Sequence, residues 1–394
     1  MVREGRARAA AARRLTQTPE PDSTREASRV TTLELFFDLV FVFTIAELTT
    51  VLFAEPNVRG VVQVFLMLGV IWWMYGGYAW LTNAVSAHTT LRRLLLLGGM
   101  GGYFVLSLAV PNAFTSSGLA FGLGYLAVVA VHAILFTRAS GNAARAILTL
   151  APFNLASAGV VLLGGALGGT AQYALWAFAV GFEWVTPWLR RPSAFAISPA
   201  HFVERHALVV IVAIGESVVA VGIGAAHLDV DLALVAIVLV GLALSACLWS
   251  VYFGGGEDEV EEALAALPQR QRSFAALNAF GYWHFPLLFA IVAIASVERE
   301  AISQPFSELS WARAALLAAG VGVYLAGDVF FRRALRLRTA RTRGAAALLT
   351  AATVPVGATL TAFAEIALLV ALLAIALASE HPARTARPGA TVSM

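Results

Sequence analysis

Two carboxylates stand in an otherwise apolar stretch near the start of the chain. The segment Leu33–Phe43 reads LELFFDLVFVF and contains Glu34 and Asp38. Their spacing of four residues places both on one face of a helix, about one turn apart. A carboxylate inside an apolar helix needs a partner, a proton or water, and we expect Asp38 to face a polar interior. Glu34 has an ordinary alternative role, as a first-turn residue stabilised by the helix dipole.

A second ionisable stretch, His201–Gly222, reads HFVERHALVVIVAIGESVVAVG. Glu204, Arg205 and His206 are consecutive at its start. Two interpretations stay open for them. One is an ion-pair cluster at the membrane surface, and the other is a proton-titratable gate or relay, because histidine titrates near neutral pH.

Further polar residues lie deeper in apolar segments. Glu216 and Ser217 fall near the middle of the second stretch, and Glu183 stands four residues before Pro187 in GFEWVTPW. A charge at mid-bilayer costs on the order of 3 kcal/mol, so we take Glu216 and Glu183, with Ser217 beside Glu216, as candidates for a substrate or ion pathway. Together with Glu34, Asp38, Glu204, Arg205 and His206 they form the predicted set.

Other polar and aromatic residues have structural interpretations. Asp328 lies close to Arg332, which predicts a surface ion pair. His132 and His284 are expected to be satisfied interior histidines. The aromatic run Trp72–Trp80 reads first as a belt at the membrane interface.

Composition places the chain in a membrane. Of 394 residues, 59% are hydrophobic and 13% are charged, and the mean hydropathy is +0.78. An ordinary soluble protein has about 25% charged residues. The single cysteine, Cys247, excludes an internal disulfide and a cysteine-based metal cluster. No phosphate loop, HExxH, CxxC or nucleophile-elbow motif is present, so we expect neither an enzyme nor a bound cofactor or metal.

Apolar segments of membrane-spanning length recur along the whole chain. They predict an all-α, polytopic bundle of about twelve transmembrane helices, at 31–53, 59–81, 91–112, 117–138, 144–167, 170–189, 201–226, 230–253, 272–297, 310–331, 344–361 and 363–381. The expected organisation is a disordered tail 1–30, a first half 31–190, a second half 201–381 and a tail 382–394. Similarity between Trp72–Trp80 and Leu248–Gly256 suggests a parallel 6+6 repeat.

The arginines predict the orientation of the bundle. The chain has no lysine, and of its 27 arginines only Arg59, Arg299 and Arg313 fall on the outer side when the N-terminus is inside. Both termini are therefore expected in the cytoplasm. The acidic loop around 257–262 is expected to be a solvated connector, with a short surface helix as the alternative. The arginine-rich tail suits anionic lipid better than nucleic acid.

The two ionisable stretches carry a family resemblance. LELFFDLVFVFTIAEL at Leu33–Leu48, together with the stretch His201–Gly222, resembles the bacterial low temperature requirement A (LtrA) family over most of the chain. The resemblance implies a bacterial inner-membrane protein and names no substrate. The family's motif positions fall on Glu34, Phe37, Asp38, Glu204, Arg205, His206, Gly215, Glu216 and Ser217.

These observations favour a secondary transporter or proton-coupled permease. Its substrate would be a small solute or an ion, and the proton is one such ion. In this hypothesis Asp38 and Glu216 face a central cavity between two six-span halves. The alternatives are a passive ion channel and a non-transporting membrane sensor or scaffold.

Overall fold

The computed structural model describes residues 30–84, 89–137, 142–190, 197–339 and 341–380. Within these ranges the chain consists of helices and their connections, with no strand. The expected all-α class is therefore confirmed. Apart from Val30, the predicted tails 1–30 and 382–394 lie outside the described residues.

Six long helices make up the first half of the chain. They are α3 (Thr32–Ala54), α4 (Val58–Ala84), α5 (Thr90–Ala109), α6 (Gly118–Thr137), α7 (Asn142–Leu167) and α8 (Gly169–Arg190), with a 3-10 turn η1 (Val110–Asn112) after α5. Threonines cap two of these helices, because the side chain of Thr31 accepts from Glu34 N–H and that of Thr89 accepts from Arg92 N–H. The tight turn into α8 uses Gly168 and Gly169, whose φ values of 66° and 57° suit glycine.

The second half is less regular. Its elements are α9 (Pro199–Ala225), α10 (Leu232–Phe253), α11 (Glu257–Ala265), α12 (Gln269–Ala276), a π-helical turn η2 (Leu277–Tyr282), α13 (His284–Ser303), α14 (Trp311–Ala334), α15 (Arg341–Leu349), a 3-10 turn η3 (Thr350–Thr353), α16 (Val354–Thr359) and α17 (Ala362–Ala378). The acidic loop forms the helix α11, so the alternative of a short helix is confirmed over a simple solvated connector. Its first turn carries Glu257, Asp258 and Glu259, which suits a helix N-terminus.

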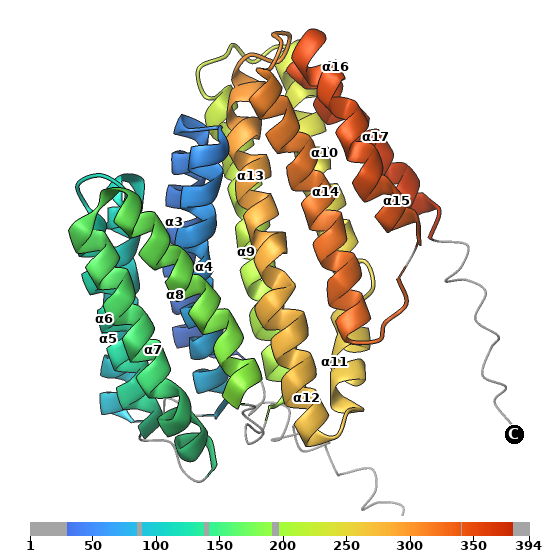
Figure 1. The fold of residues 1–394 in the computed structure, drawn as a ribbon. Coiled ribbons are helices and arrows are strands. Elements are labelled where there is room, and N and C mark those ends of the chain that lie inside the picture. Colours follow the sequence, from blue (N-terminus) through green and yellow to red (C-terminus); the bar gives the residue numbers. More distant parts are fainter. Residues whose placement is uncertain (1–29, 85–88, 138–141, 191–196, 340, 381–394) are drawn as a thin grey trace, which may run out of the picture.

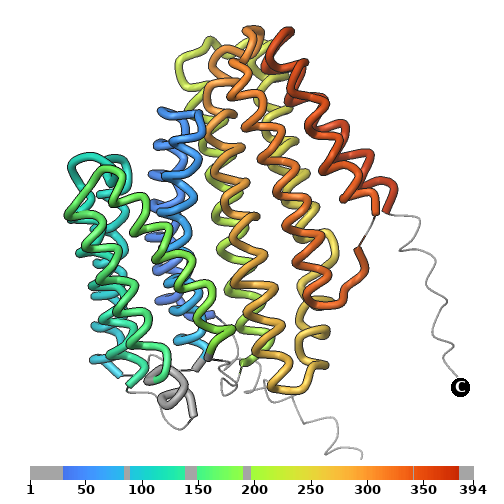
Figure 2. Tube along the Cα trace, viewed as in Figure 1, coloured from blue at the N-terminus to red at the C-terminus, as the bar shows by residue number. Residues whose placement is uncertain are grey.

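The long helices stand side by side in one bundle (Figures 1 and 2). Helices α5 to α8 lie on one side, α3 and α4 lie beside α9 and α13 in the middle, and α14 to α17 lie on the other side. We call the end of the bundle that contains α12 the lower end and the opposite end the upper end. Helices α3 and α9 both start at the lower end and therefore run parallel.

Nine helical segments are long and apolar enough to cross a membrane, among the residues that the structure describes. Three of the twelve expected spans do not meet that criterion. Residues 170–189 form α8, which carries Gln172 and Glu183; the segment 344–361 is broken at η3; and α17 has 17 residues. The helical, multi-pass character is thus shown, with nine candidate spans.

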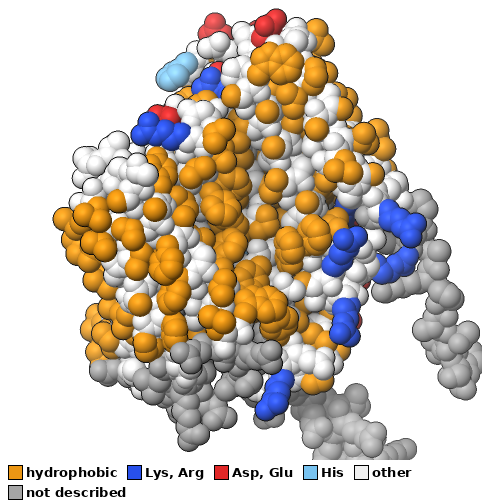
Figure 3. Space-filling model, viewed as in Figure 1, with side chains coloured by type: hydrophobic (Ala, Val, Ile, Leu, Met, Phe, Trp, Pro, Cys, Tyr) orange, Lys and Arg blue, Asp and Glu red, His pale blue; other side chains and the backbone are white. Residues whose placement is uncertain are grey.

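The outer surface fits a lipid environment. Large apolar side chains, such as Leu39, Phe104, Leu123 and Leu239, are exposed along the sides of the bundle. In the face drawn in Figure 3, hydrophobic side chains cover the middle of the bundle, while acidic and basic side chains gather toward its ends and its right edge. Helices that are apolar on every face are typical of membrane spans.

The aromatic run of α4 does not form an interfacial belt, so that prediction is wrong. Trp72, Tyr75 and Tyr78 are 2%, 0% and 1% exposed. Helix α4 packs against α3, α6, α8 and α13. Its aromatic rings therefore meet protein on most sides, whereas a belt needs rings that reach the lipid headgroups.

Candidate functional site

The best-defined polar site joins the lower parts of α3 and α9. Asp38 of α3 is 2% exposed and Arg205 of α9 is 1% exposed. Arg205 Nη2 lies 3.1 Å from Asp38 Oδ1, and Nη1 donates to Oδ2 at 3.3 Å. Tyr75 of α4 donates its hydroxyl to Oδ1 at 2.8 Å. This two-point contact, with a third donor, compensates two charges that would be costly alone in an apolar interior.

Aromatic rings complete the surroundings of the guanidinium. The Arg205 Cζ atom lies 5.6 Å from the centre of the Phe37 ring and 5.7 Å from that of the Tyr75 ring. Both distances are within the range of a cation–π interaction. The rings also exclude water from the ion pair, which strengthens it.

A second pair lies next to the first. The Nε2 atom of His201 is 3.0 Å from Glu34 Oε1. The other carboxylate oxygen of Glu34 accepts from the N–H of Thr31 at 2.7 Å and from its hydroxyl at 2.8 Å, which makes a capping box at the start of α3. Glu34 therefore has the first-turn role that its position suggested, and it has a histidine partner in addition.

The two pairs form a ladder because the spacing on the two helices matches. Glu34 and Asp38 are four residues apart on α3, and their partners His201 and Arg205 are four apart on α9. Parallel helices with the same rise per residue keep such pairs in register. We call these four residues together with Tyr75 the α3–α9 site.

The consecutive residues Glu204, Arg205 and His206 do not form one cluster. Successive helical residues are rotated by about 100°, so they point in different directions. Glu204 Oε2 accepts from the N–H of Val30 at 3.2 Å. His206 is buried with Nδ1 2.8 Å from the carbonyl of Phe202, and its ring centre is 5.5 Å from that of His284. Only Arg205 of the three belongs to the α3–α9 site.

Glu216 and Ser217 belong to a different, upper region. Eleven residues separate Arg205 from Glu216 on α9, which is about 16 Å at 1.5 Å per residue. Glu216 forms no ion pair within 4 Å in the described part of the chain, although Arg299 of α13 and Glu47 of α3 are near enough to interact electrostatically. Asp38 thus meets Arg205, and the structure does not bring it together with Glu216.

Glu298 of α13 is the buried acid that the sequence analysis missed. Its side chain is 0% exposed, and neither carboxylate oxygen has a hydrogen-bond partner among the described residues. The side chain of Ser217 lies next to this carboxyl, but no hydrogen bond of acceptable geometry joins them. The predicted span ended at residue 297, which placed Glu298 in a loop. A helix that continues to Ser303 places it inside the bundle.

Glu183 occupies a third polar position, between α6, α7 and α8. Its Oε1 atom accepts from the Tyr125 hydroxyl at 2.5 Å and from the Ser157 hydroxyl at 2.7 Å. Its Oε2 atom has no partner among the described residues, and the residue is 1% exposed. The carboxyl is therefore held by neutral donors, with no arginine beside it in that part of the chain.

Asp328 shows the opposite arrangement. It is 0% exposed and accepts two hydrogen bonds from Arg332 Nε, at 3.1 and 3.2 Å, and a very short one from Arg343 Nη1. Arg343 also donates to Glu380 at 2.7 and 2.8 Å. The expected ion pair of Asp328 with Arg332 is confirmed, but its expected place at the surface is wrong, because α15 covers Asp328 and supplies the second arginine. We call these four residues the α14–α15 cluster.

The interior histidines also differ from each other. His284 has partners for both nitrogens, the carbonyl of Ala279 at 3.0 Å and the hydroxyl of Tyr252 at 2.8 Å. His132 is 2% exposed, and its Nε2 has no hydrogen-bond partner among the described residues. Within the same ranges, no group of three or more His, Cys, Asp or Glu side chains is placed to hold a metal ion.

Fold and buried charges together define a helical, multi-pass membrane protein with paired and unpaired carboxyls inside its bundle. The family model of the bacterial low temperature requirement A protein (LtrA) matches residues 29–378, and the chain belongs to this family. The Uncharacterized protein RA0937 of Rhizobium meliloti (strain 1021) is 24% identical over an alignment of 316 residues that covers 76% of this chain and 76% of that protein. No solved structure matches the chain.

Proposed function

We propose that this LtrA protein is a proton-coupled permease for a small solute or ion, and not an enzyme. The observation that carries the proposal is Glu298. A fully buried carboxyl with no hydrogen-bond or ionic partner in the described structure is stable there only as the neutral acid, or while a proton or cation moves through. Intramembrane carboxyls of this kind are typical of proton relays.

The arrangement of α9 supports the same proposal. This one helix contributes Arg205 to the α3–α9 site and Ser217 to the surroundings of Glu298. A tilt or shift of α9 against α3 and α13 would therefore change both polar regions at once. In this proposal the ion pair of Asp38 with Arg205 acts as the lower gate, and Glu216 and Glu298 form the upper proton site.

We also infer the finer architecture, twelve spans in two parallel repeats. The main packing contacts within one half have counterparts in the other. Helix α3 packs on α4 and α5, and in the same way α9 packs on α10 and α13. Helices α5 to α8 pack in sequence, as do α13, α14, the broken α15–α16 and α17. Finally, α4 contacts α8, and α10 contacts α17. Because each repeat has six spans, both termini lie on the same side of the membrane, and we place them in the cytoplasm and the protein in the inner membrane.

The transport proposal is tested in proteoliposomes loaded with a pH-sensitive dye. Under an imposed membrane potential, the wild type is expected to move protons. Glu298→Gln and Glu216→Gln keep the shape of each side chain and remove its titration, so each is expected to lower the protein-dependent flux about 10-fold or more, as loss of a proton-transfer group does. Glu308→Gln removes an exposed acid at the same end of the bundle and serves as the matched control.

Equal flux in the wild type and in both buried variants, at equal reconstitution, would contradict the proposal. Large single-channel currents with no dependence on a proton gradient would instead assign a passive ion channel. Topology is tested separately. A fluorescent protein fused to the C-terminus is expected to fold and fluoresce, which requires a cytoplasmic C-terminus.

One observation favours a second candidate, a non-transporting membrane sensor or scaffold. Asp38 is fully compensated by Arg205 and Tyr75, as a purely structural ion pair would be. For this candidate the α3–α9 site fixes the two halves together. An absence of flux in the wild type, with a stable fold, would favour it over the permease.

A further inference from the structure

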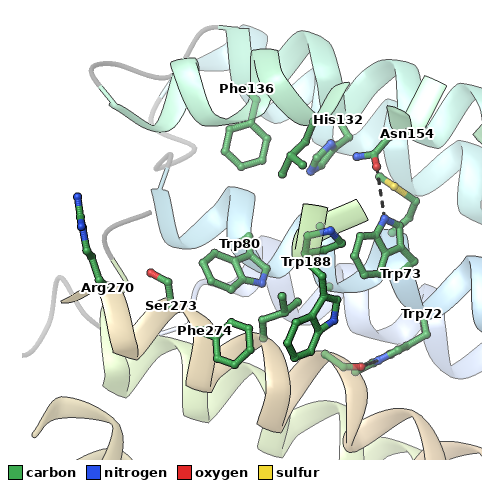
Figure 4. A pocket seen from close by; sticks show the side chains of 17 residues that line it. Trp72, Trp73, Trp80, His132, Phe136, Asn154, Trp188, Arg270, Ser273 and Phe274 are labelled. Atoms are coloured by element: carbon green, nitrogen blue, oxygen red, sulfur yellow. Dashed lines mark hydrogen bonds between the residues drawn. The ribbon is translucent and has the colours of Figure 1, made fainter. Parts of the chain in front are cut away.

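A cavity of about 460 Å³ lies between the two halves, apart from every site described above. Its walls come from α4, α6, α7 and α8 on one side and from α12 and η2 on the other (Figure 4). Small-molecule sites in proteins commonly have volumes of about 300–1,000 Å³. The volume is therefore sufficient for a ligand of drug-like or fatty-acid size.

Large aromatic side chains make up a substantial part of the lining. Trp72, Trp80, Trp188, Phe136 and Phe274 turn toward the cavity from four different helices (Figure 4). Two of these rings also pack on each other, since the centres of Trp188 and Phe274 are 4.9 Å apart with their planes at 86°. Such walls favour an apolar chain or ring.

A polar patch interrupts this aromatic lining. His132 and Asn154 lie together on one wall (Figure 4), and Asn154 Oδ1 accepts from Trp73 Nε1 at 3.4 Å. His132 Nε2 is buried and makes no hydrogen bond of acceptable geometry among the described residues, although the backbone of Gly77 lies next to the ring. It lies close to the pocket-lining Gly77, where an added Cβ would come within 3.1 Å of it. A ligand hydroxyl or carbonyl would satisfy this nitrogen, which a plain hydrocarbon cannot do.

The charge at the cavity has one sign. Arg270 of α12 is exposed and is the charged member of the lining, and no aspartate or glutamate lines the cavity in the described residues. Arg270 forms no ion pair there with a carboxylate of the described chain. An arginine beside an apolar cavity is complementary to an acid whose body enters the cavity.

We propose that this cavity binds an amphiphilic organic anion, with its apolar body between the tryptophans and its acidic group at Arg270. A hydrogen-bonding group on the body reaches His132. The ligand is either a free small acid or an anionic lipid of the surrounding leaflet, because both carry the same chemistry. The proposal does not depend on transport, since it concerns equilibrium binding.

The test uses quenching of tryptophan fluorescence by a bromine atom on contact. The probe is ω-bromododecanoate, titrated into the purified full-length protein in nanodiscs of neutral lipid, with empty nanodiscs as background. Saturable quenching is expected in the wild type. Gly76→Leu is chosen to fill the cavity, because Gly76 lines it and no atom lies within 4 Å of a Cβ placed there. This variant is expected to weaken binding about 10-fold or more.

Two controls make the result specific. Gly98→Leu is the matched variant, because Gly98 has equally open surroundings and does not line the cavity, and its binding is expected to equal that of the wild type. Arg270→Ala is expected to weaken ω-bromododecanoate about 10-fold and to leave the neutral ω-bromododecanol unchanged. Arg338→Ala, an exposed arginine outside the cavity, controls for net charge. Equal quenching in wild type and Gly76→Leu would overturn the site, and equal affinity of acid and alcohol would overturn the anion.

Further measurements identify the source and the polar contact. Nanodiscs that contain phosphatidylglycerol with brominated chains quench the wild type more than Gly76→Leu if lipid is the occupant; equal quenching there, with the free probe still bound, assigns a free acid. Competing dodecanoates with one hydroxyl at successive positions test His132. At least one is expected to bind about 5-fold tighter than dodecanoate in the wild type and not in His132→Phe. No difference in any of them would overturn the contact with His132.

Discussion

The buried acids of this protein fall into two groups that differ in their partners. Asp38 and Asp328 each lie against arginine, at the lower end of the bundle. Glu183 and Glu298 are as deeply buried and have no arginine within ion-pair distance in the described ranges; Glu183 has two hydroxyl donors and Glu298 has none. Burial alone therefore does not assign a role to an acid in a membrane protein.

The difference has an energetic consequence. A paired carboxylate stays charged, and removal of one partner leaves the other as an uncompensated buried charge. An unpaired carboxyl is cheapest as the neutral acid, so an amide of the same shape replaces it with little loss. Paired acids should dominate stability, and unpaired acids should matter for function.

The largest effect is expected at the α14–α15 cluster. Asp328→Ala leaves Arg332 and Arg343 buried with only Glu380 as a counter-charge. We expect the free energy of unfolding to fall by about 3–5 kcal/mol, measured by detergent-induced unfolding in micelles. Arg333→Ala is the control, because Arg333 directly follows Arg332 in the chain and is exposed. A loss for Asp328→Ala no larger than for the control would remove this acid from the paired group.

A double-mutant cycle at the α3–α9 site is expected to give the next largest effect. Arg205→Leu leaves Asp38 buried and charged, which should cost about 3 kcal/mol of unfolding free energy. The double variant Asp38→Leu with Arg205→Leu removes both charges and should recover at least half of that loss. If the loss in the double variant equals the sum of the losses in Asp38→Leu and Arg205→Leu alone, the two side chains are not coupled.

A pair of tyrosine variants compares the two groups directly. Tyr75→Phe removes a hydrogen bond to the charged Asp38, and Tyr125→Phe removes one to Glu183. Hydrogen bonds to charged groups contribute about 1.5–3 kcal/mol and those between neutral groups about 1 kcal/mol. We therefore expect Tyr75→Phe to lower the unfolding free energy more than Tyr125→Phe. Equal losses would indicate that Glu183 is also ionised.

The smallest effect on stability is expected at Glu298. Glu298→Gln should change the unfolding free energy by no more than about 1 kcal/mol, because the amide resembles the neutral acid. The same variant should abolish most of the proton flux if the permease proposal holds. A loss of several kcal/mol would mean that Glu298 is charged and compensated, which would move it into the paired group.

Sequence patterns located some of these sites better than others. The spacing of four between Glu34 and Asp38 predicted a shared helix face, and the structure uses that face against His201 and Arg205. The pairing itself joins residues 167 positions apart in the chain. Local spacing carries no information on which distant helix lies opposite, so Glu216 was an equally reasonable partner for Asp38.

A misplaced helix boundary and unforeseen helix packing explain the other differences between the sequence-based predictions and the structure. Glu298 was missed because hydropathy falls in VERE, although the helix continues. Asp328 was expected at the surface because its neighbours are arginines, and the covering helix α15 was not visible from composition. The aromatic run of α4 is assigned to the interface because aromatic residues are common there, while packing on the surrounding helices buries most of it.

The sequence by itself determined the all-α membrane class, the family and the positions of most buried acids, because apolar length, charge scarcity and helical spacing are local properties. Only the tertiary structure decided which acids have an arginine, which rings line a cavity and which histidine nitrogen lacks a partner. The physical reason is that the cost of a buried charge depends on the groups that packing brings to it from other helices.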